Sequence, residues 1–145
     1  MISKNTDNIA VISISNSQSS NDLRENTELI SEGKFYKSGD KFYIFYSESD
    51  TEETSACSVM ITVEKDRVTM SRKGEFSSKM VYKEGLTDSV AYHTPFGDML
   101  MMLKTEKVVN ELTELGGKLR LCYKLIINGE EMDNDLELNV KVERN

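Results

Sequence analysis

The sequence predicts an all-β protein, a closed antiparallel up-and-down β-barrel of about eight to ten strands. Three observations lead to this fold. Apolar and polar residues alternate along most of the chain, as they do in half-buried strands. Short turns rich in glycine, asparagine, aspartate and serine separate these segments, and no strand–helix–strand rhythm interrupts them. A long meander closes to hide its edges, which favours the barrel over a Greek-key sandwich.

The first half of the chain contains alternating segments that we expect to be strands. They cover residues 9–15, 25–36, 42–48, 56–64, 67–73 and 76–82. Residues 16–22 have the polar composition of a turn, residues 38–41 form the next turn, and residues 49–55 form a polar, acidic loop. Residues 65–66 and 74–75 are tight turns, so each strand here is followed by its antiparallel neighbour.

The second half continues the pattern, with expected strands over residues 89–94, 99–104, 118–127 and 136–143. Residues 95–98 contain the single proline and form a turn, and Asn128-Gly129 is typical of a two-residue hairpin turn. Residues 105–117 are ambiguous. The same apolar side chains fit either a helical stripe or a bent, bulged strand: Val108, Val109, Leu112 and Leu115.

The length of 145 residues is typical of one domain, so we expect a single barrel over residues 1–145 with a flexible N-terminus at 1–7. The net charge of −7 repels phosphate groups, which disfavours nucleic acids and anionic membrane surfaces as partners. No apolar run approaches the length of a membrane span, and the first residues lack the apolar region of a secretory signal. The cytoplasm is therefore the expected location.

Five fragments carry a resemblance to a known family. They are Glu32-Gly33-Lys34-Phe35-Tyr36, Tyr46-Ser47-Glu48, Met70-Ser71-Arg72-Lys73-Gly74, Tyr92-His93-Thr94-Pro95-Phe96-Gly97 and Gly117-Lys118-Leu119-Arg120-Leu121-Cys122-Tyr123. In this order and spacing, from about residue 11 to 142, they resemble the YwiB-like family of bacterial proteins, a domain of unknown function. The resemblance implies a lipocalin-like (calycin) barrel and a bacterial cytosolic setting, and it assigns no catalytic residue. The loop over residues 49–54 departs from the family, whose members tend to place a glycine there.

Strand parity places a carboxylate and a guanidinium together at one rim of the barrel. Glu48 continues the apolar face of residues 42–46, and Arg72 continues the face of Val68 and Met70. Because an unpaired charge is costly there, the two side chains form either a structural ion pair that plugs the barrel or a ligand-recognising pair. The candidate ligand-binding residues are Tyr46, Glu48, Arg72, Tyr92 and Tyr123.

The remaining reactive side chains predict no metal, no cofactor and no catalytic residue. His93 is the single histidine and faces outward by strand parity, without a positioned partner for acid–base work. Cys57 and Cys122 lack zinc-ligand spacing, and two buried thiols are a simpler expectation than a disulfide. The acidic loop lacks the ordered ligand pattern of a calcium site, although three carboxylates lie in it: Asp50, Glu52 and Glu53.

Aromatic residues concentrate in the hairpin around residues 35–46, on both faces of its strands. The inward rings belong to the core, whereas Tyr43 and Phe45 face outward and offer either further packing or a surface for a partner.

Three functions follow, in order of preference. The first is a lipocalin-like barrel that binds a small apolar or amphipathic molecule in its lumen. The second is an interaction protein, for example a homodimer, with a filled interior. The third, by analogy of fold alone, is an enzyme acting on a small acid. The sequence leaves open whether the interior is a pocket or a plug.

Overall fold

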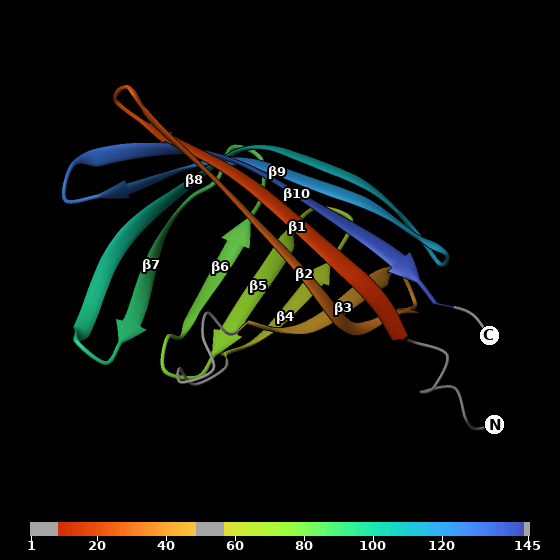
Figure 1. Ribbon diagram of the computed structural model, residues 1–145. Helices are drawn as coiled ribbons and strands as arrows, with labels where there is room; N and C mark the ends of the chain where they lie inside the picture. The colour runs from red at the N-terminus through yellow and green to blue at the C-terminus, as the bar shows by residue number, and fades with distance from the viewer. Residues whose placement is uncertain (1–8, 49–56, 144–145) are drawn as a thin grey trace.

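The computed structural model describes residues 9–48 and 57–143, and these residues form ten strands joined by turns (Figure 1). The strands are β1 (Ile9–Ser20), β2 (Leu23–Ser38), β3 (Lys41–Glu48), β4 (Cys57–Val63), β5 (Val68–Lys73), β6 (Ser78–Tyr82), β7 (Thr87–Thr94), β8 (Gly97–Thr113), β9 (Gly116–Ile127) and β10 (Glu130–Val142). The predicted all-β, antiparallel, up-and-down architecture is confirmed. The described part of the chain includes no helix with the length and apolar character needed to cross a membrane.

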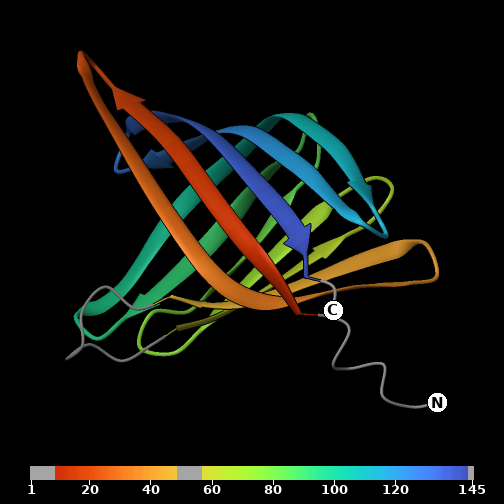
Figure 2. The same ribbon diagram turned by 45° about the vertical axis from the view of Figure 1, so that its right-hand side comes forward.

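All ten strands belong to one sheet, in the order β6-β5-β4-β3-β2-β1-β10-β9-β8-β7. Every pairing is antiparallel, and the first and last strands lie side by side, with Ala10 opposite Val142. The sheet is rolled up, so that β6 and β7 at its two ends come together (Figures 1 and 2). This arrangement is a meander whose ends have been brought into a nearly closed barrel.

The barrel closes at the seam between β6 and β7 through a single bridge in the described residues. Ser77 and His93 exchange two backbone hydrogen bonds, each of 2.9 Å. Farther along, Thr105 of β8 bonds to the turn that precedes β7, through Gly85 and Leu86. The described parts of β6 and β7 share no continuous ladder.

One half of the barrel is filled by an apolar core. Side chains alternate between buried and less buried positions along the central strands, as the sequence predicts. The largest fully buried aliphatic residues come from strands all around the barrel: Ile12, Ile44, Ile61, Leu103, Leu119, Leu121 and Leu138. This packing fixes the register, because a slip by one residue would turn each strand inside out.

The polar segment expected to be a turn at residues 16–22 is mostly strand, so that prediction is wrong. β1 continues to Ser20, and only Asn21-Asp22 form the turn to β2. Residues 16–19 pair with β2 on one side and β10 on the other, so two ladders outweigh their turn-like composition. The tip of this long hairpin projects beyond the rest of the barrel (Figure 2). Similarly, β10 begins at Glu130, directly after the predicted Asn128-Gly129 turn, rather than at residue 136.

Most of the ambiguous segment 105–117 is strand, with a turn at residues 114–115, and the bent, bulged alternative is confirmed. β8 runs on to Thr113, with a register shift between Thr105 and Lys107 opposite β9. The extra residue disrupts the local alternation, and this explains why the apolar spacing also fitted a helix. The expected flexible N-terminus at 1–7 and the acidic loop with its carboxylates lie outside the described residues.

Candidate functional site

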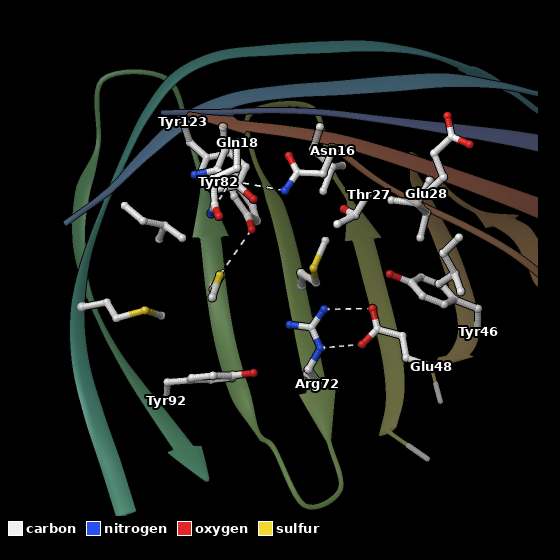
Figure 3. Close-up of a pocket in the computed structure, with 18 residues that line it drawn as sticks. Asn16, Gln18, Thr27, Glu28, Tyr46, Glu48, Arg72, Tyr82, Tyr92 and Tyr123 are labelled. Atoms are coloured by element: carbon white, nitrogen blue, oxygen red, sulfur yellow. Dashed lines mark hydrogen bonds and ion pairs between the residues drawn. The ribbon is translucent and has the colours of Figure 1, made fainter. Parts of the chain in front are cut away.

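A cavity of about 460 Å³ occupies the other half of the barrel (Figure 3). The five candidate residues chosen from the sequence all line it: Tyr46, Glu48, Arg72, Tyr92 and Tyr123. The other lining residues are Ile14, Asn16, Gln18, Thr27, Glu28, Leu29, Met70, Met80, Tyr82, Met101, Leu125, Asn134 and Leu136. The interior is therefore neither fully packed nor fully hollow, because the core described above forms the floor of this cavity.

The strand period explains how the polar residues come together. Tyr46 and Glu48 stand on the inner face of β3, and Met70 and Arg72 stand on the inner face of β5. In the register, Tyr46 lies opposite Val59, and Val59 lies opposite Arg72. The small valine between them leaves room above it for longer side chains to reach across β4.

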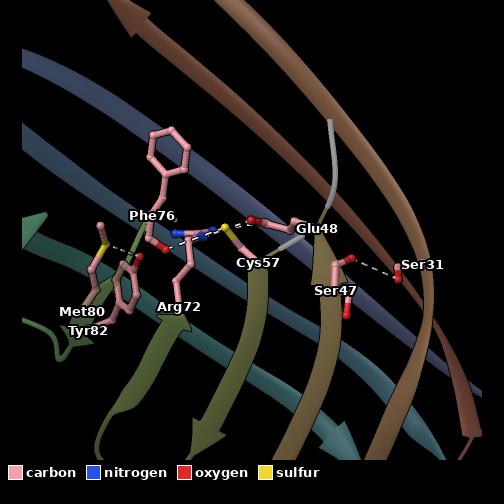
Figure 4. Close-up of polar contacts among 8 residues, drawn as sticks. All are labelled: Ser31, Ser47, Glu48, Cys57, Arg72, Phe76, Met80 and Tyr82. Carbon is pink, nitrogen blue, oxygen red and sulfur yellow. Dashed lines mark hydrogen bonds and ion pairs between the residues drawn. The ribbon is translucent and has the colours of Figure 1, made fainter. Parts of the chain in front are cut away.

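Glu48 and Arg72 form a bidentate ion pair at the wall of the cavity. Arg72 Nε donates to Oε1 of Glu48 at 3.0 Å, and Nη2 donates to Oε2 at 3.1 Å (Figures 3 and 4). The side chain of Arg72 is 19% exposed and that of Glu48 is 30% exposed, so the pair is largely shielded from water. Burial alone would lower the pKa of Arg72, but the hydrogen bonds and charge of Glu48 raise it above its ordinary value. The guanidinium therefore stays charged.

Three tyrosines present neutral phenols to the same space. Burial raises the pKa of Tyr46, and the neighbouring Glu48 carboxylate raises it further. Burial also raises the pKa of Tyr82 and of Tyr123, whose ring centroids lie 4.9 Å apart in an edge-on contact. The Tyr82 hydroxyl donates to Sδ of Met80 at 3.3 Å. The phenols are thus hydrogen-bonding groups at neutral pH rather than bases.

An amide cluster that the sequence reasoning missed lies across the cavity. Asn16 Nδ2 and Gln18 Nε2 both donate to Oδ1 of Asn134, at 3.2 and 3.1 Å. Asn134 is 4% exposed and donates in turn to the carbonyl of Met132. The assignment of residues 16–22 to a turn hid this cluster, since a turn has no inward face. One sequence pattern could have indicated the cluster: Asn134 has the same strand parity as Leu136 and Leu138, which predicts that its side chain points inward.

The other reactive groups, His93, Cys57 and Cys122, do not line the cavity. His93 is exposed as expected, but it has a partner, with Nδ1 2.8 Å from Oδ1 of Asp98. Cys57 is buried and donates to the Phe76 carbonyl at 3.7 Å, beside the ion pair (Figure 4). Cys122 is only half-buried, and both thiols are free. Over residues 9–48 and 57–143, no group of three or more His, Cys, Asp or Glu is suited to a metal ion.

The outward rings of the aromatic hairpin pack against one another. Tyr36 stacks on Tyr43 with centroids 5.1 Å apart, and on Phe45 at 6.2 Å. All three side chains are half-buried rather than fully exposed. The inner pair, Phe35 and Phe42, is buried and stacks at 5.7 Å, so the inward rings belong to the core as predicted.

Fold and site together define a class: a ten-stranded, nearly closed antiparallel barrel with a packed floor and a cavity at one end. The family model described as "Domain of unknown function (DUF1934)" matches residues 12–138, and the chain belongs to this family. The fold is also similar to the crystal structure of the ywiB protein from Bacillus subtilis, with a TM-score of 0.85 and 15% sequence identity. That match covers 94% of this chain and 93% of the other. No curated protein matches the chain.

Proposed function

We propose that this protein is a lipocalin-like binding barrel that holds one small amphipathic molecule in its cavity. The observation that carries the proposal is the cavity itself, about 460 Å³ of space above a solid apolar floor. Pockets for small molecules commonly have volumes of about 300–1,000 Å³. A purely structural barrel of this size would fill the space with side chains, as the other half of the molecule does.

The walls of the cavity suit an apolar tail of loosely defined shape. Methionines contribute from three strands, through Met70, Met80 and Met101. Flexible thioethers adapt to irregular ligands better than branched side chains do. Aliphatic side chains of β1, β2, β9 and β10 complete the apolar lining: Ile14, Leu29, Leu125 and Leu136.

The charged pair of the cavity lies on the β3–β5 side, the amide cluster lies across from it, and tyrosine hydroxyls are the other polar groups between stretches of apolar wall. The Glu48–Arg72 pair holds its guanidinium in a fixed orientation through two hydrogen bonds. A few oriented polar groups within an apolar wall are the usual design of a site that selects one end of an amphipathic ligand.

The test uses N-phenyl-1-naphthylamine, a neutral fluorescent probe that brightens in apolar surroundings. We expect saturable binding of one probe per chain to the wild type. Leu125→Trp places a large ring in the cavity and should weaken binding at least about tenfold, because a filled cavity excludes the probe. Leu100→Trp is the matched control, since Leu100 is 70% exposed on the outer face. Equal binding by both variants, or none by the wild type, would overturn the proposal.

A second candidate is self-association through the outer face of β2 and β3. The stacked rings of Tyr36, Tyr43 and Phe45 form an apolar surface there. Sedimentation velocity over a hundredfold concentration range would show a dimer, and Phe45→Lys should abolish it. A monomer at every concentration removes this candidate and leaves the cavity proposal intact.

The proposed location of this binding function is the cytoplasm. Cys57 and Cys122 are both free thiols, as is usual in a reducing compartment. Cell fractionation of the producing organism tests this, and recovery outside the soluble cell fraction would contradict it.

A further inference from the structure

We propose that the polar end of the cavity binds a carboxylate, so that the ligand is an amphipathic monocarboxylic acid. This inference rests on the proposed binding function and adds the chemistry of the ligand's head group. The carboxylate would accept hydrogen bonds from the edge of the Arg72 guanidinium that Glu48 leaves free. The tyrosine hydroxyls on either side of Arg72 would complete the site.

The hydrogen-bond inventory of Arg72 supplies the first argument. A guanidinium has five N–H donors, and Glu48 takes one from Nε and one from Nη2. Three donors remain. In Figure 3 the third nitrogen points away from Glu48, toward the side of the cavity where Tyr92 lies. A charged, oriented donor edge facing a cavity matches the fork of a carboxylate.

The neighbours of Arg72 supply the second argument. Tyr46 and Tyr92 lie on either side of it in one row across the inner face, as the register of β3 to β6 and the Ser77–His93 bridge require. Both phenols line the cavity, and the raised pKa of Tyr46, caused first by burial, keeps that hydroxyl protonated. The row therefore offers donors, which favours a ligand rich in acceptors.

The charges on this wall of the cavity also favour a carboxylate over a cationic head group. Each Glu48 oxygen already accepts a hydrogen bond from Arg72, so the negative charge of Glu48 is compensated. The other carboxylate among the lining residues, Glu28 of β2, is exposed, has the outward parity of its strand and points away from Arg72 (Figure 3). On the β3–β5 wall a cationic head group would therefore meet the guanidinium and no unengaged carboxylate. Arginine readily bridges two carboxylates, one on each edge, because its donors fan out in one plane.

The apolar wall sets the direction of the ligand's tail. Met70 precedes Arg72 on the same inner face of β5, and Met80 lies opposite Met70 on β6. A carboxylate seated at Arg72 would therefore direct an alkyl chain along these methionines into the cavity. This places the head group near Glu48 and the tail above the apolar floor.

The experiment compares three ligands of equal chain length, decanoate, 1-decanol and decylamine, as displacers of N-phenyl-1-naphthylamine at pH 7.5. We expect decanoate to bind about tenfold tighter than 1-decanol, because hydrogen bonds to a charged group contribute that much. Decylamine should bind most weakly. Probe binding with equal affinities for all three ligands, or tighter binding of decylamine, would overturn the carboxylate inference alone. Absence of probe binding would instead overturn the binding function.

Variants assign the selectivity to the proposed groups. The double variant Glu48→Gln/Arg72→Met removes both charges without leaving one unpaired, and it should reduce the decanoate-to-decanol affinity ratio to about one. Glu48→Gln alone keeps Arg72 and frees more of its donors, so the ratio should rise. Tyr92→Phe should lower the ratio by a few-fold, the contribution of one hydrogen bond. An unchanged ratio in the double variant would contradict the role given to Arg72.

Discussion

Glu48 and Arg72 meet in two hydrogen bonds of 3.0 and 3.1 Å although a whole strand, β4, separates the strands that carry them. The backbones of β3 and β5 are two interstrand spacings apart, about 9–10 Å. The pair can form because both side chains are long and the β4 residues opposite them, Cys57 and Val59, are short. The contact fastens three neighbouring strands to each other at the wall of the cavity.

Removing one partner of the Glu48–Arg72 pair should destabilise the barrel more than removing both partners. Arg72→Met leaves the Glu48 carboxylate uncompensated in a largely buried place, and we expect a loss of about 2 kcal/mol in unfolding free energy. Glu48→Gln/Arg72→Met should recover most of that loss. Urea unfolding of the four forms gives the coupling directly.

The exposed pair Arg120–Asp135 is the control for that cycle. Its hydrogen bonds are equally short, 3.0 and 2.8 Å, but its side chains are 42% and 45% exposed. Solvent screening should make its coupling smaller than that of Glu48 and Arg72. A larger coupling for the exposed pair would contradict the shielding argued for the cavity wall.

The folded protein should lose stability at alkaline pH because of its buried tyrosines. Burial raises the pKa of Tyr46, Tyr82 and Tyr123, so the folded state holds protons that the unfolded chain releases near pH 10. Unfolding free energy should therefore fall as the pH rises above about 10. Tyr82→Phe should flatten that slope by up to about 1.4 kcal/mol per pH unit. Parallel curves for wild type and variant, from urea unfolding at pH 8–11, would refute this.

Removal of one buried hydroxyl should stabilise the protein. Thr105 is 1% exposed, and its Oγ1 has no hydrogen-bond partner in the described chain. Thr105→Val keeps the shape and removes an unsatisfied polar atom, which should add about 1 kcal/mol to the unfolding free energy. Thr113→Val is the matched control, because Thr113 Oγ1 donates to the Gly116 carbonyl at 3.1 Å, and that variant should be less stable. Thermal unfolding distinguishes the two signs.

Two glycines should respond differently to alanine. A Cβ at Gly33 would overlap the backbone oxygen of Phe45 and lie 2.7 Å from Cδ1 of Ile12, so Gly33→Ala should cost about 3 kcal/mol or more. At Gly39 nothing lies within 4 Å, and only its φ of +62° opposes a side chain, at about 1 kcal/mol. Denaturant unfolding of both variants tests the order. A milder effect at Gly33 would show that β2 and β3 can separate there.

Most of the fold could be predicted because burial on one face leaves a period of two in the sequence. Segments such as Leu119, Leu121 and Tyr123 carry that period clearly, and they are buried in the structure. The hairpin arm at residues 16–20 was not predicted because its residues are polar on both faces, and its strand form depends on pairing with β2 and with the distant strand β10. Local composition cannot report a ladder formed with residues more than a hundred positions away.

The inward-facing residues of the site could be predicted from the sequence, but the position of the cavity could not. Parity alone brought Tyr46, Glu48 and Arg72 into one space, since each continues an apolar inner face. The position of the cavity along the barrel could not be predicted, because it depends on which end the core fills. Tyr82 also lines the cavity at the same parity as Met80, but an inward tyrosine at a strand end looks like core until the neighbouring volume is known.

The bridge between Ser77 and His93 gives the barrel two different kinds of junction. Between β1 and β10, the first and last strands, the sheet is continuous through ten paired positions. Between β6 and β7 the chain runs on through a short turn, while the hydrogen-bond ladder is reduced to that single bridge. The barrel is therefore closed between β6 and β7 mainly by the covalent chain, at the place where the hydrogen bonds between neighbouring strands are fewest. In mechanical terms the molecule is a rolled sheet with a hinged edge. A cut between Lys83 and Glu84 would leave β6 joined to β7, among the backbone hydrogen bonds of the described residues and apart from the one within the turn, by the two at the far end from the turn.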